Sequence, residues 1–177
     1  MGYLSIDDLN ELSAGAFADE VAPLFEGARG FLDRLAAARP FDSDHAFLVT
    51  AREVARTMPE ADQVELLNAH PPLGGDPAVV SPASFEEQGY ASPEGAEGEP
   101  VLEDLAMLNE VYEGRFGFRY VVFVASRPLS AMVPLMEAAM RNDREAELGR
   151  GLDDVIDIAA DRLGRLRGEF LDREGDA

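Results

Sequence analysis

The chain has 177 residues, of which 46% are hydrophobic and 28% charged, which is ordinary for a globular protein with one buried core. It contains no cysteine, which excludes disulfides and thiolate chemistry. The formal net charge of -20, with all 15 basic residues arginine, argues against binding nucleic acid or an anionic membrane surface, because both require clustered cations.

The N-terminal part is patterned for helices. Ser5, with Asp8 three residues later, is typical of a helix N-cap, and Asp42 or Ser43 begins a later helix. Between these caps the apolar residues recur at helical spacing: Phe17, Val21, Leu24, Phe25, Phe31, Leu32, Leu35 and Ala36.

A histidine ends the next predicted helix. Pro59-Glu60 begins a helix that must stop at His70, because Pro71-Pro72 disfavours helix before it and Gly74-Gly75 opens a loop. Such a loop fixes the imidazole and leaves one side open to a ligand. The helix C-terminus favours the protonated ring, whereas burial favours the neutral one. A simple helix cap is the alternative interpretation of His70.

The other histidine, His45, lies near the first turn of a helix and is expected at the surface. Two histidines so far apart, without the spacing of a metal-binding pair, predict no metal site.

Ser84, Glu87 and Gln88 would project from one face of a short helix that begins at Ser81-Pro82. The same Ser-x-x-Glu pattern is also a capping box, in which both side chains satisfy backbone amides. If the helix begins at Ser81-Pro82, Ser84 lies inside the first turn and Glu87 is available for another role.

The remaining sequence alternates helices with irregular segments, and we expect one all-α domain, a multi-helix bundle over 1–177. The apolar run Tyr120–Val124 is short enough for a buried strand or an extended segment. The other predicted elements are a surface loop over 89–100, a helix ending near Gly117, a helix from Pro128, a last helix from about Arg144 to Phe170 and an acidic, frayed tail over about 168–177.

One arginine interrupts the apolar stripe of the last predicted helix. The stripe consists of Leu148, Leu152, Val155, Ala159, Leu166 and Phe170. Arg162 falls in this series, and a guanidinium at such a position needs an anionic partner. It is either paired internally at the edge of the core or faces a pocket that receives a carboxylate or a polar ring. The periodicity leaves both alternatives open.

Four sequence elements, in this order, carry a family resemblance. They are Glu65-Leu66-Leu67-Asn68-Ala69-His70-Pro71 with Leu73-Gly74; Ser84-x-x-Glu87-Gln88; Leu108-Asn109, Tyr112 and Arg115-Phe116-Gly117-Phe118; and Arg141-Asn142-Asp143, Glu147-Leu148, Ile158-Ala159 and Arg162-Leu163. From about Leu9 to Leu163 the chain resembles the decarboxylases of 2-oxo-4-hydroxy-4-carboxy-5-ureidoimidazoline (OHCU).

The resemblance implies a cofactor-free decarboxylation of OHCU to (S)-allantoin in urate breakdown, by an all-α and commonly homodimeric enzyme without a metal. It implies His70 as the central acid/base, Glu87 as its partner carboxylate and Arg162 as a substrate-binding cation. It also implies four further substrate-binding residues: Pro71, Ser84, Gln88 and Phe118.

The chain departs from the family pattern outside those positions. The departures are Pro72, Gly75-Asp76, Arg119, Ala125 to Pro128, and Phe31 at a usual tryptophan position. Two alternative functions stay open: a helical binding protein that keeps the fold without turnover, and a hydrolase acting on a related ureido-imidazoline.

The expected location is the cytoplasm. No apolar run approaches the roughly 20 residues of a membrane span. The sequence MGYLSIDDLNELSAG has no basic region followed by an apolar one, as a signal peptide would, and REGDA is not a peroxisomal signal. The expected partner is a small anionic substrate, which a chain this acidic can attract only through a local cationic pocket.

Overall fold

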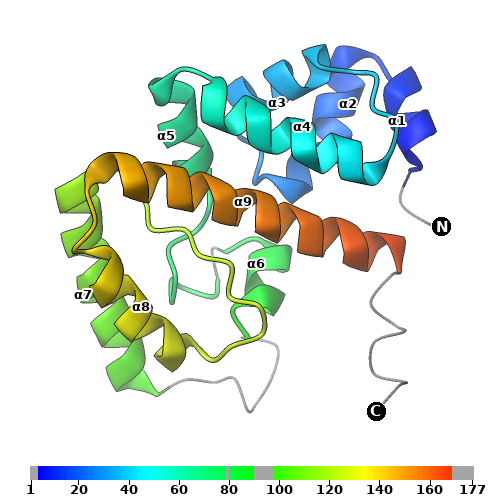
Figure 1. The fold of residues 1–177 in the computed structure, drawn as a ribbon. Coiled ribbons are helices and arrows are strands. Elements are labelled where there is room, and N and C mark those ends of the chain that lie inside the picture. Colours follow the sequence, from blue (N-terminus) through cyan, green and yellow to red (C-terminus); the bar gives the residue numbers. More distant parts are fainter. Residues whose placement is uncertain (1–3, 79, 90–97, 169–177) are drawn as a thin grey trace.

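The structure is a computed structural model that describes residues 4–78, 80–89 and 98–168. Within these ranges the secondary structure consists of α-helices and two 3₁₀ turns, without a β-strand, which confirms the expected all-α class. The long helix α9 (Arg144–Arg167) crosses the middle of the molecule, with one group of helices on each side (Figure 1). None of the described helices is both long and apolar enough to cross a bilayer.

The first group comes first in the sequence and packs on one side of α9. It consists of α1 (Ile6–Glu11), α2 (Ala14–Val21), the 3₁₀ turn Ala22–Leu24, α3 (Arg29–Ala37), α4 (Asp44–Thr57) and α5 (Glu60–Ala69). Serine caps decide several of these starts, since the side chains of Ser5, Ser13 and Ser43 accept hydrogen bonds from the backbone of the first turn.

The second group lies on the other side of α9 (Figure 1). It consists of α6 (Pro82–Glu87), α7 (Glu99–Phe116), the 3₁₀ turn Leu129–Ala131 and α8 (Met132–Ala139). Gly117 ends α7 in the left-handed conformation that glycine adopts without steric cost, with φ of 80°.

Two aromatic clusters form much of the core on the two sides of α9. The N-terminal cluster packs Phe17, Phe25, Phe31, Phe41 and Phe47 edge to face or tilted. The other cluster packs Tyr112, Phe116, Phe118 and Tyr120 around the end of α7. Both are buried, and helix α9 supplies the apolar surface between them.

Ion pairs also hold α9 against the first group. Arg52 of α4 donates to Asp153 at 2.9 Å and to Asp157 at 2.6 Å. Near the other end of the helix, Arg167 donates to Asp44 at 2.7 Å. These contacts fix the axial position of α9, and with it the positions of the side chains that α9 presents to the second group.

Most predicted boundaries agree with the structure, and two expectations need correction. The predicted loop over 89–100 ends too late, because α7 begins at Glu99. Pro100 lies in the first turn of this helix, where its missing N–H costs nothing. Residues 90–97 lie outside the described residues. Leu166 is 46% exposed, so the buried stripe of α9 ends before it. Phe170 and the acidic tail beyond Gly168 also lie outside the described residues.

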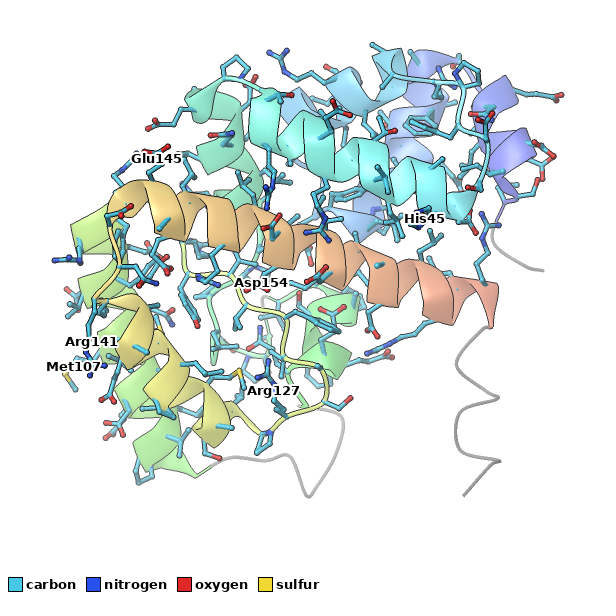
Figure 2. The ribbon with its side chains drawn as sticks, viewed as in Figure 1. His45, Met107, Arg127, Arg141, Glu145 and Asp154 are labelled. Atoms are coloured by element: carbon cyan, nitrogen blue, oxygen red, sulfur yellow. The ribbon has the colours of Figure 1, made fainter. Side chains whose placement is uncertain are left out.

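The segment Tyr120–Val124 is irregular and forms no β-strand with any other part of the described chain. Arginine side chains take the place of a partner strand. Arg150 donates to the Val121 carbonyl at 2.9 Å, and Arg127 donates to the carbonyls of Phe123 and Val124 at 2.6 and 2.9 Å. Figure 2 shows Arg127 in the loop before α8, on the opposite side of α9 from His45. His45 is exposed, as expected.

Candidate active site

A pocket opens where the loop after α5, the end of α6, the segment Tyr120–Val124 and α9 meet. The lining residues are His70, Pro71, Leu73, Glu87, Gln88, Tyr120, Val121, Val122, Phe123, Val124, Ala125, Ser126, Ile158 and Arg165. Four of the predicted site residues, His70, Pro71, Glu87 and Gln88, therefore line one pocket although the sequence separates them into two motifs.

His70 is the C-cap of α5 and is 3% exposed. Its Nδ1 lies 3.1 Å from the Leu66 carbonyl oxygen. Because a carbonyl can only accept, Nδ1 carries the hydrogen of the neutral ring and Nε2 carries the lone pair. Nε2 is buried and has no hydrogen-bond partner among the described residues. The pocket thus contains a base with an unused lone pair.

The charge state of His70 follows from its surroundings. Burial, together with the nearby positive charge of Arg162, lowers the pKa of His70 from 6.5 to about 4. Of the two opposing effects expected at this helix end, burial therefore outweighs the partial negative charge of the helix C-terminus. The ring is neutral at pH 7.

The loop after His70 is fixed by polar side chains. The backbone N–H of Gly74 donates to Gln88 Oε1 at 2.8 Å, and Asn109 Nδ2 donates to the Leu73 carbonyl at 2.8 Å. Gly74 has a φ of +69°, and a Cβ there would lie 2.9 Å from Leu105 Cδ1, so both backbone conformation and space require glycine. Gln88 therefore supports the loop as well as lining the pocket.

Arg119 holds the His70 backbone from the other side. Its Nη1 donates to the carbonyl of His70 at 2.6 Å and to that of Asn68 at 3.1 Å. Its backbone N–H donates to Asn68 Oδ1 at 2.9 Å. Sequence reasoning recognised Arg119 only as a departure from the family pattern, because the carbonyls to which its guanidinium donates lie about 50 residues away in the sequence.

Arg162 lies behind the pocket wall at the centre of an ion-pair cluster. It is 5% exposed. Its Nε and Nη2 donate to the two oxygens of Glu87 at 2.6 and 2.9 Å, Nη1 donates to the Pro23 carbonyl at 2.8 Å, and Nη2 also donates to Glu26 at 2.7 Å. Of the two alternatives left open by the helix periodicity, the structure shows the internally paired one.

Glu26 is a site residue that sequence reasoning missed. It lies between α2 and α3 with a φ of 52°, and its Oε1 accepts from Ser81 and Ser84 at 2.8 and 2.9 Å as well as from Arg162. Burial acts to raise the pKa of Glu26, but the Arg162 charge and the serine hydrogen bonds outweigh it and hold the pKa below its usual value. No periodicity or motif distinguishes this residue from a surface glutamate.

Ser84 is part of the same cluster and is not a helix cap. Ser81 is the N-cap of α6, and its side chain accepts from the Ser84 N–H. Ser84 itself donates to Glu26 and accepts from Arg162 Nη2 at 3.2 Å. The capping-box alternative for Ser84 and Glu87 is therefore wrong.

Phe118 lies apart from the other predicted site residues. Its ring packs in the aromatic cluster against Tyr112 and Phe116, with Arg144 above it at 5.4 Å, and it is not among the residues that line the pocket. Contacts of Phe118, Ser84 and Arg162 with a substrate stay predictions. So does a direct contact of Glu87 with His70, since the hydrogen bonds shown for Glu87 go to Arg162.

Within the described ranges no group of three or more histidine, aspartate or glutamate side chains is arranged to hold a metal ion. The functional groups that the pocket offers are an imidazole, a carboxylate, an amide, a tyrosine, a serine hydroxyl and a guanidinium. Burial raises the pKa of that tyrosine, Tyr120, to about 12, so its hydroxyl is neutral and can donate. These groups suit proton transfer on a polar ring.

The comparison with protein families decides where this chain belongs. The model of the OHCU decarboxylase family matches residues 10–164, which include His70, Glu87 and Arg162. The chain belongs to the OHCU decarboxylase family. The resemblance in the four sequence elements is thereby confirmed.

Individual family members are distant in sequence. An OHCU decarboxylase of Haloferax volcanii is 29% identical over 163 residues, which span 92% of this chain and 96% of that protein. The uric acid degradation bifunctional protein PucL of Bacillus subtilis is 29% identical over 162 residues, but these span only 32% of its length. A solved structure of OHCU decarboxylase in the presence of (S)-allantoin has the same fold, with a TM-score of 0.68, 24% identity and coverage of 85% of this chain and 98% of that one.

Proposed function

We infer that this chain is a decarboxylase of urate degradation that converts OHCU to (S)-allantoin. The observation that carries this conclusion is the family match over residues 10–164. Proteins that match nearly their whole length, such as the one from Haloferax volcanii, are OHCU decarboxylases. The chain also retains the histidine, the carboxylate and the arginine that the resemblance assigns to the reaction.

The substrate contains its own electron sink. One ring carbon of OHCU carries the carboxylate and a hydroxyl, and the neighbouring ring carbon belongs to an imine. When the bond to the carboxylate breaks, its electron pair forms a carbon–carbon double bond, and the imine electron pair moves to nitrogen, which takes up a proton. Loss of the hydroxyl proton and protonation of the neighbouring carbon then give allantoin. The protein needs to hold the substrate and transfer protons.

His70 is suited to the proton transfers. Its Nδ1–H is engaged by the Leu66 carbonyl, so the ring is oriented and Nε2 is the basic nitrogen. We propose that Nε2 accepts the hydroxyl proton of OHCU and returns a proton to one face of the intermediate. Transfer from a fixed side chain to one face gives a single enantiomer.

Glu87 and Arg162 have linked roles in this proposal. Glu87 lines the pocket and is itself held by both Nε and Nη2 of Arg162, so the guanidinium fixes the plane of the carboxylate that borders the substrate. We propose that Glu87 accepts hydrogen bonds from the ring and ureido N–H groups. Arg162 would then act on the substrate through Glu87, or directly after exchange of partners.

We further propose that 1–177 forms a single domain and that the enzyme works in the cytoplasm as a homodimer without metal or organic cofactor. The family resemblance and the chemistry above support these proposals. Light scattering tests the dimer. Exhaustive chelation should leave the rate unchanged, and recovery of a lost rate with one particular divalent ion would contradict the metal-free mechanism.

The function is tested by adding the protein to urate, urate oxidase and hydroxyisourate hydrolase. We expect faster formation of (S)-allantoin, seen by circular dichroism, together with release of one CO2 per turnover. Slow formation of racemic allantoin at the uncatalysed rate would identify a non-catalytic binding protein. Consumption of the substrate without CO2 release would identify a hydrolase.

A further inference from the structure

The pocket poses a charge problem for an anionic substrate. The whole chain has a formal net charge of -20, which repels a carboxylate. Behind the wall, the single positive charge of Arg162 is shared by Glu26 and Glu87, so this cluster is negative overall. His70 is neutral because burial lowers its pKa to about 4. None of these groups provides a net attraction for the carboxylate of OHCU.

Arg165 is the one cationic side chain among the described residues that line the pocket. It projects from the last turn of α9, one helical turn beyond Arg162, and its side chain is 40% exposed. Half exposure lets the guanidinium reach both solvent and pocket, as a group that meets an incoming anion must.

Arg165 is paired within its own helix. Its Nη2 lies 2.6 Å from Asp161, four residues earlier on α9. The aspartate is 14% exposed, whereas the arginine is 40% exposed, so the guanidinium is the end of this pair that solvent and a ligand can reach. Arg162 is held by Pro23, Glu26 and Glu87 from other parts of the chain, whereas the ion pair of Arg165 uses Nη2 and leaves its other N–H groups for a substrate carboxylate.

We propose that Arg165 is the anion-attracting residue of the pocket, which draws in the carboxylate of OHCU and holds it at the mouth until decarboxylation removes the charge. This proposal rests on the proposed function. It assigns Arg165 to substrate binding, separate from the proton transfer by His70. Loss of the carboxylate as CO2 removes the attraction, so the uncharged product is held less tightly than the substrate.

Steady-state kinetics of Arg165→Gln test the proposal. We expect KM for OHCU to rise about tenfold at low ionic strength with little change in kcat, and we expect the difference from wild type to shrink as salt screens the charge. Arg165→Lys should retain most of the affinity, because a point charge suffices for attraction. Asp161→Asn should lower KM, since it frees Arg165.

Arg29→Gln is the matched control. Arg29 is paired with Asp33 four residues away on α3 and also with Asp19 of α2, and it does not line the pocket, so this variant removes the same charge away from the site. We expect its KM to equal that of wild type. An equal rise in KM for both variants, or an unchanged KM for Arg165→Gln, would overturn the proposal.

Equilibrium binding separates this proposal from the proposed function. Calorimetry with hydantoin-5-acetate, an anionic five-membered ring, and with uncharged (S)-allantoin needs no turnover. We expect Arg165→Gln to weaken binding of the anion about tenfold and to leave binding of allantoin unchanged. If the wild type lacked decarboxylase activity but bound the anion more tightly than Arg165→Gln does, the proposed function would fail and the anion site would stand. If the wild type and Arg165→Gln bound the anion equally well, the anion site itself would be refuted.

Discussion

Two arginines of α9, the half-buried Arg150 and the buried Arg162, are each paired with two carboxylates but have different relations to the pocket. Arg150 donates to Glu147 at 3.0 Å and to Asp154 at 2.6 Å, as Arg162 donates to Glu87 and Glu26. Glu147, however, is fully buried and also accepts from Tyr112 at 2.6 Å and Asn142 at 2.7 Å, whereas Glu87 lines the pocket. Pairing with two carboxylates therefore does not by itself mark an arginine as functional. We propose a role in turnover for Arg162 because its partner Glu87 borders the pocket.

Each cluster keeps one glutamate ionised against burial, although burial raises the pKa of Asp154 beside Arg150 to about 6. Burial acts to raise the pKa of Glu147, but hydrogen bonds from Arg150, Tyr112 and Asn142 outweigh it, so the pKa lies below its usual value. Glu26 shows the same balance beside Arg162. In each cluster the guanidinium is thus what allows a buried carboxylate to remain charged, and removing it should cost stability.

Replacing Arg162 should have the largest effect. Arg162→Met leaves Glu26 and Glu87 close together without their cation, so we expect a loss of about 3–5 kcal/mol in the free energy of unfolding, together with nearly all turnover per folded molecule. Arg162→Lys should restore little turnover, since a point charge cannot bind both oxygens of Glu87 in one plane. Chemical denaturation and initial rates measure both. Normal turnover per folded molecule would make Arg162 a purely structural residue.

Replacing Arg150 should reproduce the stability loss without the catalytic loss. Arg150→Met strands Glu147 in the core, and we expect a cost of about 3–5 kcal/mol by the same mechanism. Turnover per folded molecule should stay within a few-fold of wild type, because Arg150 meets the pocket lining at the Val121 carbonyl and the Tyr120 ring and not at His70 or Glu87. The same denaturation and rate measurements apply. A collapse of turnover equal to that of Arg162→Met would remove the distinction between the clusters.

Part of the pH dependence of stability should come from His70, whose pKa is lowered by burial and by the nearby charge of Arg162. The pKa of His70 is about 4 in the folded protein and about 6.5 when unfolded, so between these values the unfolded chain binds the extra proton. Stability should therefore fall by about 3 kcal/mol as the pH drops from 6.5 to 4, with no further contribution from His70 below that. Denaturation at several pH values checks this, and His70→Asn should lack this part of the dependence.

The smallest effects separate the two serines of α6. Ser81→Ala removes the N-cap of α6 and one hydrogen bond to Glu26, and Ser84→Ala removes hydrogen bonds to both Glu26 and Arg162, so each should cost about 1 kcal/mol of stability. Only Ser84→Ala should also lower the rate per folded molecule, because Ser84 bridges Arg162 and Glu26. Equal rates for the two variants would mean that the geometry of the cluster does not matter for turnover.

The sequence predicted those features that depend on neighbours along the chain. Pro71-Pro72 placed the helix end at His70, and Ser81-Pro82 placed the start of α6, both as the structure has them. The apolar stripe of α9 showed that Arg162 is buried, although it could not tell a paired guanidinium from an open one.

Features that depend on distant backbone were not predictable. Glu26 reaches Arg162 from a turn with a positive φ. Arg119 holds the end of α5 by hydrogen bonds to two of its carbonyls. The Tyr120–Val124 run has the composition of a strand, yet arginines satisfy its carbonyls instead of a neighbouring strand. Such contacts follow from tertiary packing, which leaves no local pattern in the sequence.

The central claim is that a buried, neutral His70 offers the lone pair of Nε2 to the substrate. Nitrogen NMR of the imidazole rings tests it most directly, because the chain has only two histidines and His70→Asn assigns them. Between pH 7 and pH 5 we expect the His70 ring to be neutral with its proton on Nδ1 and to stay so as the pH falls. A proton on Nε2, or a doubly protonated ring at pH 7, would contradict the account.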